Sequence, residues 1–288
     1  MRRPVKSALI GPLVAAAVTA VIPLATAVPA AADSVVVGGF PVDVSQSPWT
    51  VALASRDRFG GTRAGQFCGG VAVDRTTVVT AAHCMAEEVL GAPPDQVRDL
   101  RVIAGRTDLL STRGHEIRVS DVTVNPGYDA TTNAGDFAVI TLAESLPRNA
   151  VITMAAAGDP AYAPGTSATV YGWGDTTGAG DYTKRLRAAR IHVLPDETCR
   201  QAYPGGPEGA YRADSMLCAG EAAGGPDACQ GDSGGPLIAR GRLIGLVSWG
   251  NGCGRAASPG VYTRISEVVR ALEGARGTTS TAGARQGF

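Results

Sequence analysis

Residues 227–236 of this 288-residue chain read Asp227-Ala228-Cys229-Gln230-Gly231-Asp232-Ser233-Gly234-Gly235-Pro236. A serine hydroxyl is a good nucleophile only where a neighbouring base takes its proton. A tetrahedral oxyanion needs N–H donors that already point at it, and glycines permit a turn that aims the N–H groups of Gly231 and Ser233 at one point. The segment therefore predicts half of an acyl-transfer site.

A candidate base and a candidate acid precede this segment in the chain. His83 lies in Thr80-Ala81-Ala82-His83-Cys84, after a β-branched run, and Asp136 stands immediately before the apolar run Phe137-Ala138-Val139-Ile140. A carboxylate at the start of such a strand is buried, which is costly unless a partner such as an imidazole N–H pairs with it. The order His83, Asp136, Ser233 is that of chymotrypsin-like triads and differs from the subtilisin and α/β-hydrolase orders.

Further short motifs occur in order along the chain: Val36-Val37-Gly38-Gly39, Ser47-Pro48-Trp49, Cys68-Gly69-Gly70, Gly135-Asp136, Tyr171-Gly172-Trp173-Gly174, Val247-Ser248-Trp249-Gly250 and Pro259-Gly260-Val261-Tyr262. Each motif alone is weak or moderate evidence, but their joint occurrence in one order is very specific. In this combination the chain resembles the trypsin-like serine proteases of the chymotrypsin family, and it is closest in character to the secreted trypsins of actinomycetes. The resemblance implies a serine endopeptidase that cleaves on the carboxyl side of Arg or Lys through an acyl-enzyme.

The resemblance also implies a role for each residue of the catalytic site. Ser233 is expected to attack the scissile carbonyl, with His83 as general base and then general acid. Asp136 is expected to orient His83, and the N–H groups of Gly231 and Ser233 to form the oxyanion hole.

The substrate-binding residues follow from the same resemblance. Asp227 stands where the family has the floor of its specificity pocket, and an acidic floor selects a cationic side chain. Gly250 and Gly260 match the pocket walls. Ser248-Trp249-Gly250 resembles the segment that pairs with substrate backbone as an added strand. The expected substrate-binding residues are Asp227, Ser248, Trp249, Gly250, Gly252 and Gly260.

The first 32 residues have the features of a secretory signal peptide. A basic start containing Arg2, Arg3 and Lys6 precedes a long uncharged stretch that ends in Ala30-Ala31-Ala32. That stretch is long enough to be a membrane anchor, but its prolines and alanine-rich end favour the signal peptide. We expect residues 33–35 to be a short propeptide and the protein to be secreted to the extracellular space.

The resemblance implies activation by proteolysis. The acid before the nucleophile, Asp232, is expected to pair with a new α-amino group at Val36 and so to order the oxyanion loop. Val35 precedes that bond, whereas the expected specificity is for Arg or Lys. We therefore expect either that another protease trims Asp33-Ser34-Val35 or that the signal peptidase leaves a short extension that is removed later.

Charge and cysteine content limit the other partners. Without Arg2, Arg3, Lys6 and Asp33, the 26 basic and 26 acidic residues fall to 23 and 25. This near-neutral balance predicts no nucleic-acid partner and no membrane partner after signal removal. The expected partners are protein or peptide substrates and protein protease inhibitors, and the chain is expected to be a monomer.

Six cysteines in a secreted chain predict disulfides, for which the sequence alone allows fifteen pairings. The resemblance selects Cys68–Cys84, Cys199–Cys218 and Cys229–Cys253. A structural zinc site is disfavoured because no Cys-x-x-Cys occurs and histidines are few. We expect no cofactor and no assigned metal; calcium binding by acidic loops is left open.

Short β-type runs separated by turns predict an all-β sandwich or barrel, since 38 glycines and 18 prolines supply the turns. The resemblance chooses two packed six-stranded Greek-key β-barrels. Residues 266–273 have helical periodicity and are expected to form a C-terminal helix that stops at Gly274. The protease domain is thus expected to span 36–274, followed by a flexible tail over 275–288.

Two other functions are disfavoured by the sequence. A catalytically inactive binding protein on the same fold is disfavoured because His83, Asp136 and Ser233 are all present. An α/β-hydrolase esterase would need its acid and histidine after the serine, and no histidine follows Ser233.

Overall fold

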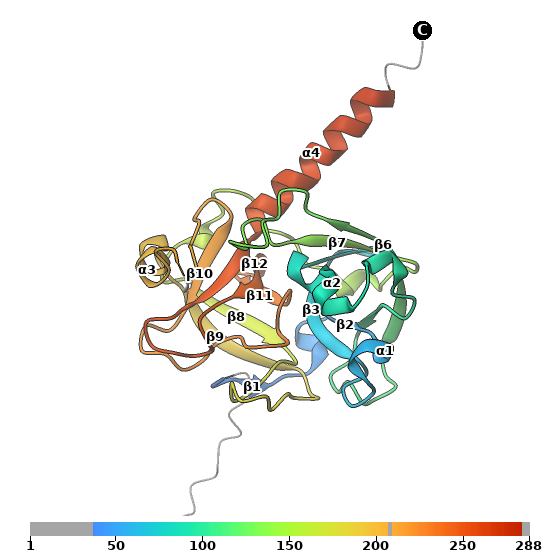
Figure 1. Cartoon of the computed structure of the whole chain (residues 1–288), viewed down its shortest axis with the longest axis horizontal. Helices are drawn as coiled ribbons and strands as arrows, with labels where there is room; N and C mark the ends of the chain where they lie inside the picture. The colour runs from blue at the N-terminus through green and yellow to red at the C-terminus, as the bar shows by residue number, and fades with distance from the viewer. Residues whose placement is uncertain (1–36, 207–208, 284–288) are drawn as a thin grey trace, which may run out of the picture. The chain divides into compact units, whose positions relative to one another are not determined.

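The computed structural model describes residues 37–206 and 209–283, so the expected signal peptide, propeptide and Val36 lie outside the described residues. Six antiparallel strands form the first barrel (Figure 1). They are β2 (Thr50–Ala54), β3 (Gln66–Asp74), β4 (Thr77–Thr80), β5 (Arg101–Ala104), β6 (His115–Val124) and β7 (Ala138–Leu142), and they close in the order β2-β3-β4-β7-β6-β5.

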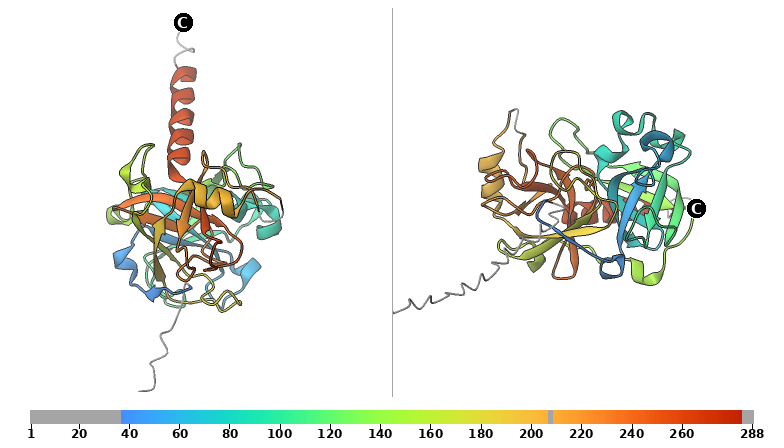
Figure 2. Two further views of the ribbon diagram at one scale, coloured as in Figure 1. Left: turned by 90° about the vertical axis from the view of Figure 1, so that its left-hand side faces the viewer. Right: turned by 90° about the horizontal axis from the view of Figure 1, so that it is seen from below.

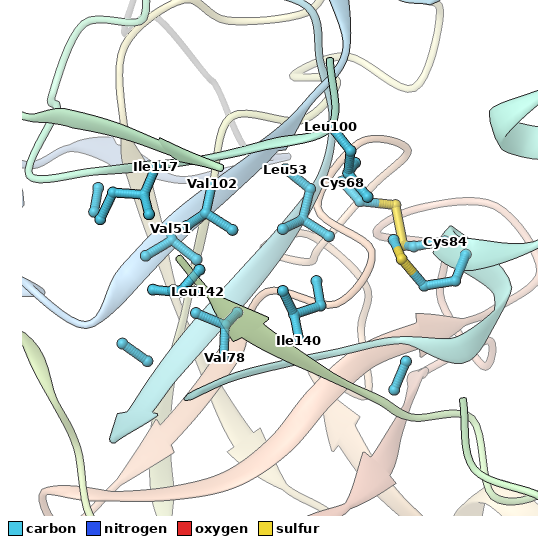
Figure 3. Packing of buried hydrophobic residues seen from close by; sticks show 14 of the residues in the cluster. Val51, Leu53, Cys68, Val78, Cys84, Leu100, Val102, Ile117, Ile140 and Leu142 are labelled. Atoms are coloured by element: carbon cyan, nitrogen blue, oxygen red, sulfur yellow. A yellow bond between two sulfur atoms is a disulfide. The ribbon is translucent and has the colours of Figure 1, made fainter. Parts of the chain in front are cut away.

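The interior of this barrel is filled by alternate residues of its strands, because successive side chains of a strand point to opposite faces. Figure 3 shows Val51 and Leu53 of β2 converging with Val78, Ile140 and Leu142. The Cys68–Cys84 disulfide lies at one side of this cluster, next to the segment that carries His83. The packed interior of the first barrel therefore supports the segment that carries His83.

The second barrel is built in the same way from the C-terminal half. Its strands are β8 (Ser167–Gly172), β9 (Arg187–Val193), β10 (Met216–Gly220), β11 (Pro236–Ala239), β12 (Arg242–Trp249) and β13 (Gly260–Arg264). They run in the order β9-β10-β13-β12-β11-β8, and a β8–β9 pairing closes the ring, with β1 (Phe40–Pro41) added beside β9. Two closed six-stranded antiparallel barrels confirm the predicted fold class.

Apolar side chains from both barrels pack together between them. One such buried cluster joins Val71, Val79 and Phe137 of the first half to Leu246 and Ile265 of the second. Fully burying a side chain of this kind stabilises by about 1.5–3 kcal/mol. Phe137 directly follows Asp136, so the packing between the barrels also fixes the position of the candidate acid.

Short helical turns connect the strands. They are η1 (Val44–Gln46), α1 (Arg56–Phe59), η2 (Ala82–Met85), α2 (Glu87–Leu90), η3 (Pro94–Gln96), η4 (Arg148–Ala150), η5 (Pro160–Tyr162) and α3 (Asp196–Ala202). Among the described residues, no helix combines the length and apolar character needed to cross a membrane.

The C-terminal helix is longer than the sequence predicts. Helix α4 runs over Ile265–Gly283, so the predicted stop at Gly274 is wrong; Figure 2 shows it continuing beyond the barrels. Gly274 does not adopt the positive φ of a helix-ending glycine, and an interior glycine costs only about 1 kcal/mol relative to alanine. Residues 284–288 lie outside the described residues, and the flexibility of 275–288 stays a prediction.

The three disulfides are those that the family resemblance implied: Cys68–Cys84, Cys199–Cys218 and Cys229–Cys253. They close loops of 16, 19 and 24 residues. On the chain-entropy account each is worth roughly 3 kcal/mol. The third joins the nucleophile segment to the far side of the cavity described below.

Candidate active site

Strand pairing brings His83 and Asp136 together. Thr80 at the end of β4 pairs with Ala138 at the start of β7, so the residues just beyond these positions lie side by side. The Asp136 carboxylate accepts the His83 backbone N–H at 2.9 Å and lies 2.8 Å from His83 Nδ1. The carboxylate is fully buried, while the imidazole is 27% exposed. One face of the pair is thus held, and the other is open to a substrate.

The second barrel adds two donors to Asp136. Ser248 Oγ donates to Asp136 Oδ2 at 2.5 Å, and Thr263 Oγ1 donates to the Asp136 carbonyl at 2.6 Å. Burial raises the pKa of Asp136, but its hydrogen bonds with His83 and Ser248 outweigh burial and hold the pKa below its ordinary value. An ionised Asp136 requires the proton of a neutral His83 to sit on Nδ1, which leaves Nε2 as an acceptor.

Ser233 lies in the turn before β11, against the first barrel. Its carbonyl accepts the N–H of Gly69 at 2.7 Å. Gly234 has φ +77°, and a Cβ there would lie 2.2 Å from Thr80 Oγ1 and 2.6 Å from the Gly69 carbonyl. Glycine is therefore required for the nucleophile turn to approach the strand end that leads to His83.

The structure brings the Ser233 turn beside His83 without a Ser233–His83 hydrogen bond. His83 Nε2 faces Cys84 Sγ at 3.8 Å, and Cys84 Sγ lies 3.7 Å from the Ser233 carbonyl. In a free enzyme such a bond is often long, and it tightens only when substrate binds.

The turn at Gly231 leaves two N–H groups available. Within 37–206 and 209–283, no residue accepts the N–H of Gly231 or of Ser233. Gly231 has φ +89°, and its carbonyl accepts Gln66 Nε2 at 2.8 Å. The unused N–H groups stand next to the candidate nucleophile, as an oxyanion hole requires.

A cavity of about 150 Å³ lies next to Ser233. Its lining contains every residue that the sequence predicted to bind substrate, namely Asp227, Ser248, Trp249, Gly250, Gly252 and Gly260. Of these, Ser248 also serves the acid Asp136, a contact that no sequence pattern signalled.

Asp227 is the carboxylate of this cavity. It is 4% exposed, and it accepts the N–H groups of Ala228 and Gly254, each at 2.9 Å. Burial raises its pKa to about 6, against the lowering effect of these two bonds. A Cβ at Gly260 would lie 3.0 Å from Asp227 Oδ1, so a side chain there would crowd the carboxylate.

The second acid of the segment, Asp232, is buried elsewhere. Its oxygens accept the N–H groups of Gly174 at 2.8 Å and Cys229 at 3.0 Å. Burial raises its pKa to about 7, and among the described residues no cation lies within salt-bridge distance of it. The two acids of the nucleophile segment thus have separate environments.

The chain directly after Val36 lies along the same segment. The Val37 carbonyl accepts the Asp227 N–H at 3.0 Å, and a Cβ at Gly38 would lie 3.1 Å from Pro226. Val36 itself lies outside the described residues, so its predicted pairing with Asp232 stays a prediction.

Cys68, His83 and Cys84 place potential metal-ligating atoms within 4.8 Å of one another. The two cysteines form a disulfide, however, and a disulfide sulfur is not the thiolate that binds a metal. The cluster does not fit a metal site, and calcium binding stays an open prediction.

Known proteins resemble this chain over most of its length. The sequence pattern of the family described as Trypsin matches residues 36–272. The chain is 42% identical over 237 residues to a trypsin of Saccharopolyspora erythraea, covering 82% of this chain and 96% of that protein. It is 35% identical to trypsin eta of Drosophila melanogaster (83% and 88% covered) and 31% identical to a trypsin of Sus scrofa (84% and 95%), each over 242 residues.

The fold and these likenesses define a serine endopeptidase, a hydrolase of peptide bonds. The chain belongs to the trypsin family, as its resemblance predicted.

Proposed function

We propose that this endopeptidase is secreted and cleaves on the carboxyl side of Arg and Lys, with Ser233, His83 and Asp136 as its catalytic triad. The observation that carries the specificity is the buried Asp227 carboxylate in the cavity beside Ser233. A guanidinium or ammonium group pairs with this carboxylate, whereas an apolar side chain leaves its charge unpaired. Gly250 and Gly260 leave space for a long side chain.

The catalytic steps follow from the positions of the side chains. Ser233 Oγ attacks the carbonyl carbon while His83 Nε2 takes its proton. The oxyanion accepts the N–H groups of Gly231 and Ser233, and the buried Asp136 carboxylate stabilises the imidazolium. His83 then protonates the leaving amine, which leaves an acyl-enzyme at Ser233, and water reverses these steps to release the acid.

A strand edge without a paired strand can align the substrate backbone. β11 pairs with β12 only as far as Leu246, with Val247 bonded to Gly234 and Gly235. The edge from Ser248 to Gly250 is therefore available to an extended peptide, which adds as a strand. Trp249 is held beside it by an edge-on contact with Tyr203, at 4.8 Å between ring centroids.

Activation is part of the proposal. Release of Val36 creates an α-ammonium group on the residue directly before Val37. The Val37 carbonyl already accepts the Asp227 N–H. Pairing of that group with the buried Asp232 would offset the cost of burying a carboxylate and hold the oxyanion turn in place. Mass-spectrometric sequencing of the fully active secreted enzyme should find Val36 as the first residue; any other start contradicts this step.

The signal peptide that the sequence predicts over 1–32 supports secretion, and the family supports protein substrates and protein inhibitors as partners. We propose a monomer.

The first test is hydrolysis of a chromogenic arginine amide against a matched phenylalanine amide, with and without a serine-directed covalent inhibitor. We expect cleavage of the arginine amide, abolished by the inhibitor. No cleavage of either amide would favour the inactive binding protein, and preference for phenylalanine would contradict the role of Asp227. A peptide-library profile of Asp227→Ser then checks whether the Arg and Lys preference depends on this residue.

A further inference from the structure

We propose that Asp175 is a positioning residue for the oxyanion hole: its N–H holds the Gln230–Gly231 peptide, and its carboxylate holds the loop around it. This inference rests on the proposed role of the Gly231 N–H as an oxyanion donor.

The first step concerns the peptide that carries the donor. The Asp175 N–H donates to the Gln230 carbonyl at 2.7 Å. A trans peptide is planar, so its C=O and N–H point in opposite directions. Holding the Gln230 oxygen on the Asp175 side therefore aims the Gly231 N–H away from it, where it stays unpaired.

This peptide needs an external restraint. Gly231 has φ +89°, and glycine adopts positive and negative φ with similar ease. The peptide could turn over and point its carbonyl into the oxyanion hole, which would remove one of the two donors. The bond from Asp175 opposes that rotation.

The second step concerns what holds Asp175. Its carboxylate is buried and accepts four backbone N–H groups of the loop that follows it. These come from Thr177 at 2.9 Å, Gly178 at 3.0 Å, Gly180 at 2.6 Å and Asp181 at 3.1 Å. Burial raises the pKa of Asp175, but these bonds outweigh burial and hold the pKa below its ordinary value. The Asp175 side chain thus holds the backbone of the whole loop over 175–182.

The far end of this loop also reaches the oxyanion turn. A Cβ at Gly231 would lie 3.2 Å from Tyr182 Cε1, so the Tyr182 ring packs against Gly231. The Arg63 guanidinium lies 4.3 Å from the centre of that ring and donates to the Trp173 carbonyl at 3.1 Å. Asp175 at one end of the loop therefore contacts Gln230, and Tyr182 at the other end contacts Gly231.

Gly174 completes the clamp. Its N–H donates to Asp232 Oδ1 at 2.8 Å, so two successive N–H groups, of Gly174 and Asp175, hold the nucleophile segment at two points. Loss of the Asp175 carboxylate would free the loop and loosen the second of these points.

The test compares Asp175→Ala with Asp181→Ala, which removes a carboxylate of equal charge from the same loop. The Asp181 residue is exposed and its carboxylate makes no hydrogen bond or ion pair with a described residue. Each variant is assayed for kcat and KM on the arginine amide. Two inhibitors separate the sites: benzamidine probes the Asp227 cavity, and an arginine aldehyde forms a hemiacetal with Ser233 whose oxygen occupies the oxyanion hole.

Deleting an oxyanion donor outright costs about 100- to 1,000-fold in kcat, so loosening one should cost about 10- to 100-fold. For Asp175→Ala we expect that loss in kcat and a similar loss of aldehyde affinity, with KM and benzamidine affinity within about twofold of wild type. Asp181→Ala should match wild type. A kcat within twofold of wild type, or an equal loss of benzamidine and aldehyde affinity, would overturn the proposal.

Asp175→Asn covers the case in which Asp175→Ala does not fold. It keeps the Oδ1 acceptor for Thr177, Gly178 and Asp181 and loses the acceptor for Gly180. We expect a folded enzyme with a several-fold lower kcat and unchanged benzamidine affinity; unchanged kcat would contradict the proposal. A wild-type enzyme inactive on every amide would instead contradict the proposed function, so the two failures are distinguishable.

Discussion

Ser248 Oγ donates a 2.5 Å hydrogen bond to Asp136 Oδ2, although 112 residues separate them in the chain. The serine belongs to the second barrel and the aspartate to the first. The bond therefore depends on how the barrels pack, and it lies within the candidate active site.

Removing this donor should weaken both stability and catalysis. In Ser248→Ala the buried Asp136 carboxylate loses one of its compensating bonds, which costs about 1–3 kcal/mol. We expect that loss in the free energy of urea unfolding, measured on inhibited enzyme, and a several-fold lower kcat. Ser145→Ala, at an exposed position whose hydroxyl makes no hydrogen bond with a described residue, is the control and should change neither. An unchanged free energy of unfolding in Ser248→Ala would show that the bond contributes nothing to stability.

Binding in the Asp227 cavity should weaken in acid. The pKa of Asp227 is raised by burial to about 6, so the carboxylate is mostly neutral at pH 5 and mostly ionised at pH 7.5. A cationic ligand pairs only with the ionised form, and binding coupled to that ionisation weakens about tenfold over this range. Calorimetric titration with benzamidine measures it. In Asp227→Asn binding should be weak and its dependence on pH should disappear; an equal pH dependence in this variant would assign the effect to another group.

The wall at Gly260 should tolerate no side chain. In Gly260→Ala the new Cβ would lie 3.0 Å from both Asp227 Oδ1 and the Tyr262 ring. We expect KM for the arginine amide to rise about tenfold or more, because the added Cβ takes up space in a close-packed pocket. Gly61→Ala, where nothing lies within 4 Å of the added Cβ, is the matched control. Wild-type KM in Gly260→Ala would contradict the assignment of this wall.

Glu116 should contribute stability that is lost in acid. Hydrogen bonds from Arg56 and Arg106 lower its pKa to about 2, although burial opposes this shift. A lowered pKa stabilises the fold above the ordinary value of about 4.5 and loses that effect as the pH falls toward 2. We expect Glu116→Gln to be about 1–2 kcal/mol less stable at pH 7, allowing for solvent screening, and to approach wild type near pH 2. Urea unfolding across this range measures it, and a constant difference would contradict the ionic contribution.

Much of the fold could be predicted because local patterns carry it. Short β-type runs and turn residues predicted an all-β sandwich or barrel, while the choice of two barrels and of the three disulfide pairs came from the family resemblance. The helix end was predicted wrongly, since a glycine such as Gly274 ends a helix only where the backbone turns left-handed there. The sequence does not reveal that conformation.

The candidate site was likewise predicted in part. Sequence by itself determined which chemical groups are present and in what order: a histidine, an aspartate before an apolar strand, and a serine among glycines with acids at positions 227 and 232 before it. These are properties of residue type and neighbourhood, so they can be read locally.

Only the tertiary structure decided which side chains and backbone groups contact one another. The Ser248–Asp136 bond, the contact of Gly234 with Thr80, and the hold of Asp175 on Gln230 join residues far apart in the chain. Such contacts arise from strand register and from the packing of one barrel on the other. Both depend on the summed burial of many side chains, which no short segment encodes.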